Sequence, residues 1–389
     1  MKTASKISPP ALHSARRQGT EEDCILVLQG GGALGAYQAG VFESLNMFYR
    51  EPTWVAGISI GSINAALIAG NPAATRIPRL REFWNLVSSS QSAAAFGANG
   101  GAREIWNEGS AAQNMLFGAP GFFKPRFPPA PLQPRGTLEA ISYYDTKPLQ
   151  ETLERLVDFD FINSGAMRLS VGAVNVRTGN FAYFDSQRQR IDARHIMASA
   201  ALPPGFAPVE IDGEYYWDGG LVSNTPLQYV LDQPGNQHRI VFQVDLFAAI
   251  GALPTTLAEV TEREKDIRFS SRTRLNTTHE LDLQVIAQAA RRLLAKLPEK
   301  FHDDPDARAL SQLRCESAVD VVHLIHRSKH YESQSKDYEF SRLSMNEHWE
   351  AGCIDMADTL HDPRWTQHAS STTGVHVFDL ASEIPTSTE

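Results

Sequence analysis

Two short apolar runs near the start of the chain, each followed by a glycine-containing turn, constrain its fold more than any other feature. Residues 24–28 and 54–58 have the length of strands and lack polar alternation, which is typical of strands buried on both faces of a parallel sheet. Between them, residues 36–49 place apolar side chains three or four positions apart, which predicts a helix. Another helix is expected over residues 60–69. This order predicts a βαβα unit with a right-handed crossover.

The turn after the second run holds a serine between two glycines. Gly57, Ser59 and Gly61 spell G-x-S-x-G, which is typical of the strand-to-helix elbow that exposes a nucleophilic hydroxyl in hydrolases. The predicted strand before the motif and the predicted helix after it favour this interpretation. Ser59 is therefore the candidate nucleophile.

A serine nucleophile needs a base that takes its proton and donors that stabilise the oxyanion. The candidate donors are the N–H groups of the glycine loop that follows the first run, at Gly30, Gly31 and Gly32. Adjacent parallel strands should place this loop and Ser59 at the same edge of the sheet. The candidate base is Asp218, which a predicted strand delivers into a turn that continues with two glycines. Asp-Gly is also common in turns without any catalytic role.

The glycine loop allows a second interpretation. Gly30, Gly32 and Gly35 satisfy G-x-G-x-x-G between a strand and a helix, which is also a dinucleotide-binding fingerprint. That site needs an acidic residue at the end of the second strand to hold the ribose. The nearby acid, Glu51, precedes the strand, and the strand ends in the Ser59 elbow. Dinucleotide binding is therefore kept as a remote alternative.

Charge and cysteine content exclude several classes of function. The formal net charge of −9 argues against non-specific binding to nucleic acid and to strongly anionic membranes, so any lipid contact is expected to be apolar and local. Cys24, Cys315 and Cys353 lie far apart without C-x-x-C spacing, so we expect neither a cysteine zinc site nor a redox pair. Few cysteines favour a reducing compartment.

The N-terminus and the longest apolar window bear on location. Residues 1–22 contain no continuous apolar stretch, so we predict a disordered start and no signal peptide. Residues 54–69 are interrupted by polar residues and fall short of the roughly 20 apolar residues of a bilayer span. We expect a cytoplasmic protein that contacts membranes at most peripherally.

Histidine is the usual base for serine, but none of the 12 histidines stands out. His195 is expected within a helix and partly buried. His323 and His326 fall in a predicted strand over residues 319–326, which would point them to opposite faces. No H-E-x-x-H motif occurs. We therefore predict no metal site and no cofactor.

Residues 88–136 are rich in Ser, Ala, Gly and Pro and show no sustained periodicity, so we predict an irregular insertion. Phe117, Phe122, Phe123 and Phe127 lie among its six prolines. The insertion is either a plain surface excursion or an apolar lid or lipid-facing flap. Elsewhere two hairpins are expected, joining 169–176 to 181–184 and 209–211 to 214–217. A further strand is expected over 240–244, helices over 79–84, 147–157, 262–297 and 345–360, and a helix beginning at Pro226 that Asn224 would cap.

Three motifs together resemble those of the patatin-like phospholipase family, both in their order and in the sequence distances between them. They are the glycine loop, Gly57-Ile58-Ser59-Ile60-Gly61 and Asp218-Gly219-Gly220. The sequences Ala200-Ala201-Leu202-Pro203 and Asn224-Thr225-Pro226 are similar to that family too. The resemblance covers about residues 24–245. Residues 335–342 and His348-Trp349 resemble the C-terminal extension of a bacterial branch of the family.

The resemblance implies a lipid acyl hydrolase with a Ser-Asp dyad and no histidine. By this carry-over Ser59 attacks the acyl carbonyl, Asp218 accepts its proton, and the Gly31 and Gly32 amides hold the oxyanion. Leu34 departs from the family, which often has a basic residue there that could contact an anionic head group. A catalytically silent lipid-binding or scaffold protein on the same fold is the alternative.

The resemblance also implies a three-layer α/β/α fold with a mixed, mostly parallel sheet and a helix-rich C-terminal extension. We expect the chain to divide into four consecutive parts. They are a disordered start (1–22), an acyl hydrolase domain (23–247), an extension packed on that core (248–376) and a loose tail (377–389).

Overall fold

The computed structural model describes residues 22–89, 101–233, 238–298, 301, 304–311, 318–329, 331–367 and 375–379. The strands are β1 (Asp23–Leu28), β2 (Trp54–Gly57), β3 (Lys124–Pro125), β4 (Tyr144–Asp145), β5 (Arg168–Asn175), β6 (Phe181–Asp185), β7 (Val209–Ile211), β8 (Glu214–Asp218), β9 (Arg239–Asp245), β10 (Val319–Ile325) and β11 (Val375–Asp379). The helices are α1 (Gly35–Phe48), α2 (Ile60–Ala69), α3 (Ala73–Val87), α4 (Gly101–Phe117), α5 (Lys147–Leu156), α6 (Phe159–Asn163), α7 (Ala193–Ser199), α8 (Leu227–Leu231), α9 (Leu257–Leu294), α10 (Pro305–Ser311), α11 (Arg342–His361) and α12 (Pro363–Thr366).

Nine of these strands form one large mixed sheet in the order β11-β10-β9-β1-β2-β5-β8-β7, with β6 paired to β5, whereas β3 and β4 pair as a separate two-stranded sheet. All neighbours from β11 to β5 run parallel, whereas β6, β7 and β8 pair antiparallel. Within it, Ile25 of β1 lies opposite Trp54 of β2 and Val241 of β9. The predicted βαβα unit, both hairpins and the mixed, mostly parallel sheet are confirmed.

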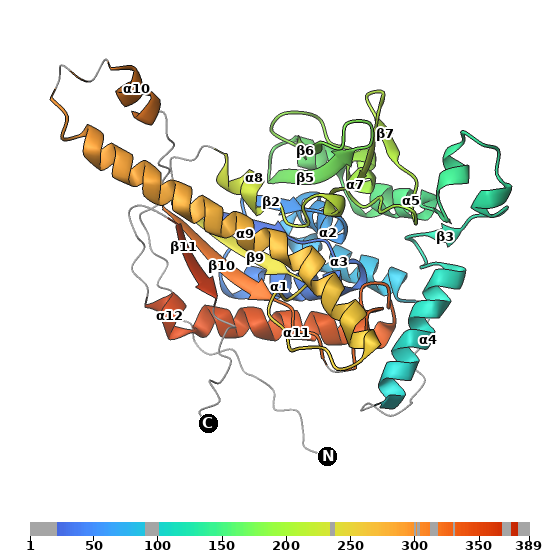
Figure 1. Cartoon of the computed structure of the whole chain (residues 1–389). Coiled ribbons are helices and arrows are strands. Elements are labelled where there is room, and N and C mark those ends of the chain that lie inside the picture. Colours follow the sequence, from blue (N-terminus) through green and yellow to red (C-terminus); the bar gives the residue numbers. More distant parts are fainter. Residues whose placement is uncertain are drawn as a thin grey trace.

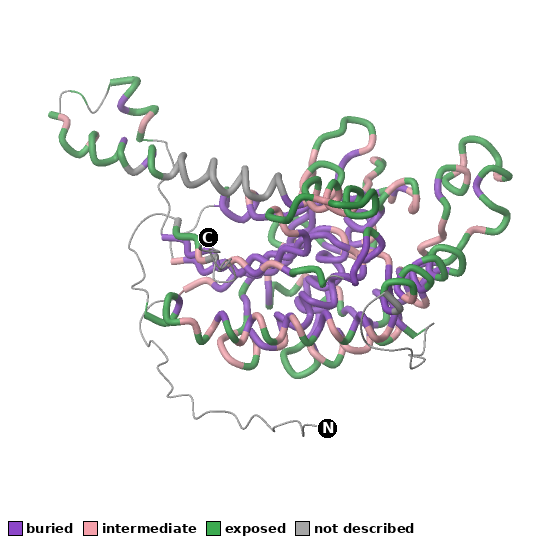
Figure 2. Tube along the Cα trace, turned by 60° about the horizontal axis from the view of Figure 1, so that its bottom comes forward, coloured by how far each residue is buried: buried purple, intermediate pink, exposed green. Residues whose placement is uncertain are grey.

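Alternate side chains of the central strands pack into two different layers. Leu26 and Leu28 join the core cluster that contains α1 and α2, whereas Ile25 and Val27 pack with Val230 and its neighbours on α8. Figure 1 shows α1 and α11 together below the sheet and α8 and α9 above it. Burial on both faces explains why the sequence of these strands is continuously apolar, and buried residues concentrate along them (Figure 2).

The C-terminal part of the chain contributes to this same sheet. β10 pairs with β9 over seven residues, from Val319↔Arg239 to Ile325↔Asp245, and β11 pairs with β10. The loose tail predicted from residue 377 is therefore wrong for residues 377–379, because strand pairing with a distant segment orders them. The rest of that tail, like residues 1–21 of the predicted disordered start, lies outside the described residues.

The predicted irregular insertion contains a helix of 17 residues, α4, and the sequence pattern concealed it for a physical reason. Helix prediction from periodicity relies on an apolar stripe that faces the core. In α4 the buried stripe is mostly polar: Arg103, Asn107, Ser110, Ala111 and Asn114. Residues 90–100 of the insertion lie outside the described part. Across the described residues, no helix combines the length and apolar character that crossing a bilayer requires.

Helices α1 and α11 approach closely where glycines face backbone. A Cβ atom on Gly40 would lie 1.9 Å from the Trp349 carbonyl oxygen, and one on Gly352 would lie 2.0 Å from the Tyr37 carbonyl oxygen. Neither space can accept a methyl group unless the helices move apart. This contact joins the C-terminal segment to the helix that follows the glycine loop.

We predict that Gly352→Ala lowers the free energy of unfolding by about 1–3 kcal/mol, because overpacking forces the two helices apart. Urea denaturation followed by circular dichroism measures this change. Gly109→Ala is the matched control, because Gly109 lies in α4 and an added methyl group there would meet no heavy atom within 4 Å. The control should gain up to about 1 kcal/mol from helix propensity. Equal stability of the two variants would contradict the prediction.

Candidate active site

Ser59 occupies a sharp turn between β2 and α2. Its backbone has φ 55° and ψ −126°, a conformation that serine rarely adopts and that lifts its side chain clear of the turn. The flanking glycines permit this turn, since a Cβ atom on Gly57 would lie 2.2 Å from the Gly61 carbonyl oxygen. The Ser59 N–H donates to Ser199 Oγ at 3.1 Å. The turn has the form expected of a nucleophile elbow.

Asp218 is the last residue of β8 and lies opposite Ala173 of β5. Its side chain is buried, and its Oδ1 atom accepts the Gly220 N–H at 2.7 Å. The Oδ2 atom is also buried, and no contact of this atom among the described residues meets the geometric limits of a hydrogen bond. Asp218 therefore keeps one oxygen that can accept a proton.

Burial raises the pKa of Asp218 to about 7, since the surroundings disfavour its ionised form. The nearby Ser59 side chain, and then the Gly220 N–H, act in the opposite direction and offset part of this rise in pKa. The Ser59 hydroxyl is thus near enough to affect the pKa of Asp218, although no contact between the two side chains meets the geometric limits of a hydrogen bond. Loose contacts between nucleophile and base are common when no substrate is bound.

The glycine loop is fixed to the segment that follows Asp218. The Gly30 N–H donates to the Asn224 carbonyl at 3.1 Å, and the Asn224 side chain donates back to the Gly30 carbonyl at 2.9 Å. The Gly30 N–H is therefore not available to an oxyanion, and of the three predicted donors only the N–H groups of Gly31 and Gly32 remain. Among the described residues, no acceptor takes the N–H groups of Gly31 and Gly32. Asn224 does not cap α8, whose N-cap is Pro226 without a side-chain bond, so that expectation was wrong.

A cavity of about 500 Å³ brings these groups together. Ser59, Asp218 and the three loop glycines Gly30, Gly31 and Gly32 line its polar end. Its apolar wall comes from segments far apart in the sequence and includes Phe122, Phe123, Phe206, Phe247 and Phe340. Gly57, Gly61 and Gly219 do not line it but shape the turns that present the polar groups. The cavity is large enough and apolar enough for a hydrocarbon chain.

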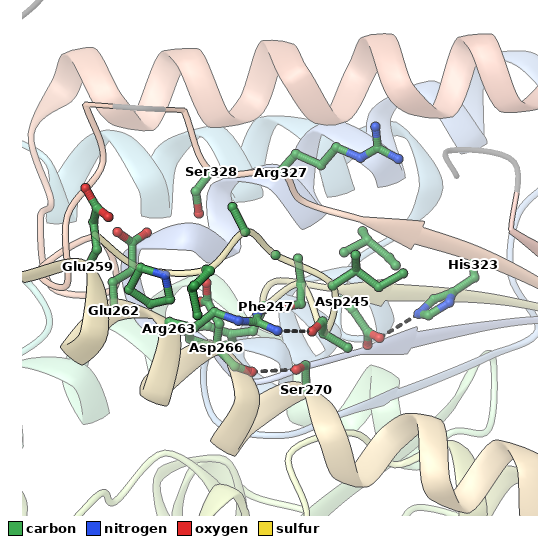
Figure 3. A pocket seen from close by; sticks show the side chains of 18 residues that line it. Asp245, Phe247, Glu259, Glu262, Arg263, Asp266, Ser270, His323, Arg327 and Ser328 are labelled. Atoms are coloured by element: carbon green, nitrogen blue, oxygen red, sulfur yellow. Dashed lines mark hydrogen bonds and ion pairs between the residues drawn. The ribbon is translucent and has the colours of Figure 1, made fainter. Parts of the chain in front are cut away.

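A larger cavity of about 690 Å³ lies next to this one, at the carboxyl ends of β9 and β10 (Figure 3). There His323 is 2.6 Å from Asp245, but the serines nearby are engaged elsewhere. Ser270 donates to the Asp266 carbonyl, and Ser328 accepts from Lys336. This cavity lacks a serine placed against a base, so the smaller cavity is the better candidate for acyl transfer.

The roles of three parts of the site could not be predicted from the sequence. Ser199 supports the elbow from α7, Asn224 fixes the glycine loop, and Asp337, Tyr338 and Phe340 form part of the cavity wall. The Asp337 carbonyl accepts the Ala33 N–H at 2.7 Å. Each of these contacts joins segments more than 130 residues apart, so no local pattern could reveal them.

The raised pKa of Asp218 predicts a stability effect that depends on pH. In the folded protein Asp218 holds its proton up to about pH 7, whereas an unfolded aspartate loses it near pH 3.9. The free energy of unfolding therefore decreases as the pH rises between these two values, because the folded state disfavours the ionised carboxyl. We predict that Asp218→Asn is more stable than the wild type at pH 8, by at most about 4 kcal/mol, and that the advantage shrinks toward pH 4.

Urea denaturation at several pH values measures this difference. Asp212→Asn serves as the control, because Asp212 is exposed in the turn that precedes the same strand. The stability of this variant relative to the wild type gives the baseline at each pH. A wild type that is as stable as Asp218→Asn at pH 8 would contradict the assignment of a costly buried carboxylate.

Two family models match the chain. One, described as patatin-like phospholipase, matches residues 26–231, and another, described as patatin phospholipase, matches residues 267–372. The cGAMP-activated phospholipase of Vibrio cholerae serotype O1 is 27% identical over 222 residues, which cover 52% of this chain and 55% of that protein. The chain thus spans about half the length of this curated relative.

Two solved structures are also similar. VipD from Legionella pneumophila aligns with a TM-score of 0.36 and 14% identity, covering 87% of this chain and 67% of that chain. A chain from the complex of ExoU with SpcU, of the type III secretion system of Pseudomonas aeruginosa, aligns with a TM-score of 0.29 and 13% identity. That match covers 74% of this chain and 60% of the other.

Proposed function

This chain belongs to the patatin-like phospholipase family, and we propose that it is a serine acyl hydrolase that cleaves lipid esters with a Ser59–Asp218 dyad. The observation that carries the proposal is the pairing of a serine in a strained elbow with a buried carboxyl whose pKa is about 7. A free aspartate is a weak base for a hydroxyl proton. Burial makes Asp218 a stronger base than a free aspartate, and this base would act near neutral pH.

In the first half of the proposed reaction, Ser59 Oγ attacks the acyl carbonyl carbon while its proton passes to Asp218. Negative charge develops on the carbonyl oxygen, where the N–H groups of Gly31 and Gly32 would donate to it. The bond to the leaving alcohol then breaks, and the Asp218 carboxyl returns the proton to that alcohol. An acyl group remains on Ser59.

In the second half, water attacks the acyl carbon and Asp218 accepts a proton from that water. The same donors stabilise the second oxyanion, and the bond from the acyl carbon to Ser59 Oγ breaks as the hydroxyl regains its proton. Since Asp218 must be ionised to act as the base, activity should require a pH near or above its pKa of about 7.

A hydrocarbon chain is the group that best fits the phenylalanine-lined wall of the cavity. The Leu34 side chain is buried in the core, so this position makes no contact with a substrate head group. Head-group recognition must come from other residues at the cavity mouth.

The outer surface of α4 supports contact with a lipid surface. This helix packs its polar stripe inward and exposes apolar side chains, of which Phe117 is 73% exposed. The segment after it also exposes Phe127 at 95% and Leu132 at 75%. Met115 of α4 and Tyr143 both line the catalytic cavity and are partly exposed. The apolar surface is therefore continuous with the cavity mouth, which favours the flap interpretation of this insertion over a plain excursion.

We predict that Ser59→Ala abolishes ester hydrolysis and labelling by a fluorophosphonate probe, because both reactions need the Ser59 oxygen. Hydrolysis of p-nitrophenyl esters of several chain lengths and gel-based detection of the probe measure the two effects. Ser62→Ala is the control, since Ser62 lies three residues away and donates to the Ser59 carbonyl from within α2.

The control variant should still be labelled. Labelling of Ser59→Ala at the wild-type rate would overturn the assignment of the nucleophile. A folded wild type that neither reacts with the probe nor hydrolyses any ester would favour the alternative, a catalytically silent lipid-binding or scaffold protein.

We also predict that the double variant Phe117→Ser with Phe127→Ser binds phosphatidylcholine vesicles at least about tenfold more weakly. Burial of each phenylalanine in lipid is worth about 1.5–3 kcal/mol. Vesicle flotation measures binding, and hydrolysis of vesicle-bound substrate should fall more than hydrolysis of a short monomeric ester. Ile354→Ser is the control, because Ile354 is an exposed apolar residue on α11. Unchanged vesicle binding by the double variant would show that this surface does not contact lipid.

A further inference from the structure

A buried cluster of two histidines and a glutamate lies outside the catalytic cavity. His326 follows β10, Glu332 lies in the next loop, and His348 lies in α11. Their exposed fractions are 3%, 8% and 3%, and one potential metal-binding atom of each lies within 4.8 Å of the others. The sequence predicted no metal site, because His326 falls in a predicted strand and no local pattern places His348 or Glu332 next to it.

The spacing within the cluster is compatible with metal coordination: its two carboxylate–imidazole contacts are long hydrogen bonds, and its potential ligand atoms all lie within 4.8 Å of one another. The carboxylate of Glu332 is 3.3 Å from His326 Nε2 through one oxygen and 3.2 Å from His348 Nε2 through the other. A charge-assisted hydrogen bond would be about 2.7–2.9 Å long. Ligands of a tetrahedral zinc ion, at about 2.0–2.1 Å from the metal, lie roughly 3.3 Å from one another.

The charge of Glu332 points in the same direction. A buried carboxylate needs a cation. Among the described residues the ion-pair partners of Glu332 are His326 and His348, which carry charge only when protonated, and none is a lysine or arginine. Lys336 lies in the same loop but pairs with Glu262 and Asp266 of α9, at 3.0 and 2.8 Å. The two imidazoles are the only side chains that face the carboxylate within hydrogen-bond distance in the described part of the chain.

An unpartnered polar group next to the cluster supplies a second, independent observation. A cavity of about 10 Å³, enough for one water molecule, is lined by Asn107 of α4 together with Glu332 and His348. Lys336, Glu339 and three serines complete the lining, and His326 is not part of it. Asn107 is 4% exposed, and its Oδ1 atom is buried without a hydrogen-bond partner in the described residues. A carbonyl oxygen or a water molecule held by it would suit the fourth position of such a site.

We propose that His326, Glu332 and His348 bind a structural zinc ion. Two imidazole nitrogens and one carboxylate oxygen are ligands that zinc accepts. The ion would join β10, the loop after it and α11 at one point. This loop contains Asp337, whose carbonyl accepts the Ala33 N–H next to the glycine loop, and Phe340 of the cavity wall. Zinc would therefore hold one wall of the catalytic cavity in place.

The test uses the full-length protein without a histidine tag. After purification without chelator, mass spectrometry of metals should find close to one zinc per chain. Removal of zinc with a chelator should lower the melting temperature by several degrees, and zinc chloride alone should restore it. These readouts hold whether or not the chain hydrolyses esters, so they are separate from the proposed function.

Variants locate the site. Glu332→Gln keeps the shape of the side chain but removes its charge, and it should weaken zinc binding at least about tenfold in a competition assay with a chromophoric chelator. His348→Ala should abolish binding. His361→Ala is the control, because His361 is exposed at the end of the same helix. Should His348→Ala fail to fold, the wild-type metal content and Glu332→Gln still decide the matter.

A wild type without zinc that also fails to bind added zinc would overturn the proposal. So would equal zinc binding by the wild type and Glu332→Gln, since the metal would then lie elsewhere. In either case the cluster is a hydrogen-bonded His-Glu-His group that orders the loop without an ion.

Discussion

Parallel pairing of β1 with β2 on one side and with β9 on the other determines where a site can form in this molecule. Both turns that carry the candidate chemistry follow from this pairing, because the carboxyl ends of β1 and β2 meet at one edge of the sheet. The glycine loop leaves β1 there, and the Ser59 elbow leaves β2. Asp218 reaches the same edge from the opposite direction, on the antiparallel strand β8. This is possible because β8 is offset along β5: Asp218 lies opposite Ala173, two residues beyond Val171, where the pairing of β5 with β2 ends.

Local patterns were enough for the parts of the fold whose side chains face a continuous core. The sequence predicted the strands buried on both faces, the helix after Ser59 and the Asp212-Gly213 hairpin, because the local residue types indicate burial or a turn. Both turn residues of that hairpin have positive φ. Helix α4 could not, since it buries asparagine and serine and exposes phenylalanine. Strand β11 could not either, because its order comes from β10.

Some residues of the candidate site could likewise be predicted from local motifs, whereas others could not. Ser59 and Asp218 stand in short motifs with a recognisable turn chemistry. Asn224 and Ser199 act through single hydrogen bonds to distant backbone atoms, and an asparagine after a turn is equally compatible with capping a helix. Burial of Asp218, which gives the carboxyl its raised pKa, depends on packing around β8 that no sequence motif describes. Sequence motifs were thus enough to propose Ser59 and Asp218 as candidate residues, whereas the packing that raises the pKa of Asp218 could not be predicted from them.

The pairing of β10 with β9 bears on how the chain can be divided. The two family models match separate stretches of sequence, which suggests two modules. Strand β9 lies between these stretches, yet it pairs with β1 of the first and with β10 of the second. A shortened protein that stopped after β9 would leave an open, apolar sheet edge, which invites aggregation. It would also lose the Asp337 carbonyl beside the glycine loop and the α11 surface that covers α1. The smallest unit able to fold with an intact cavity therefore includes both stretches, and a search for a minimal catalytic fragment should start from the whole sheet.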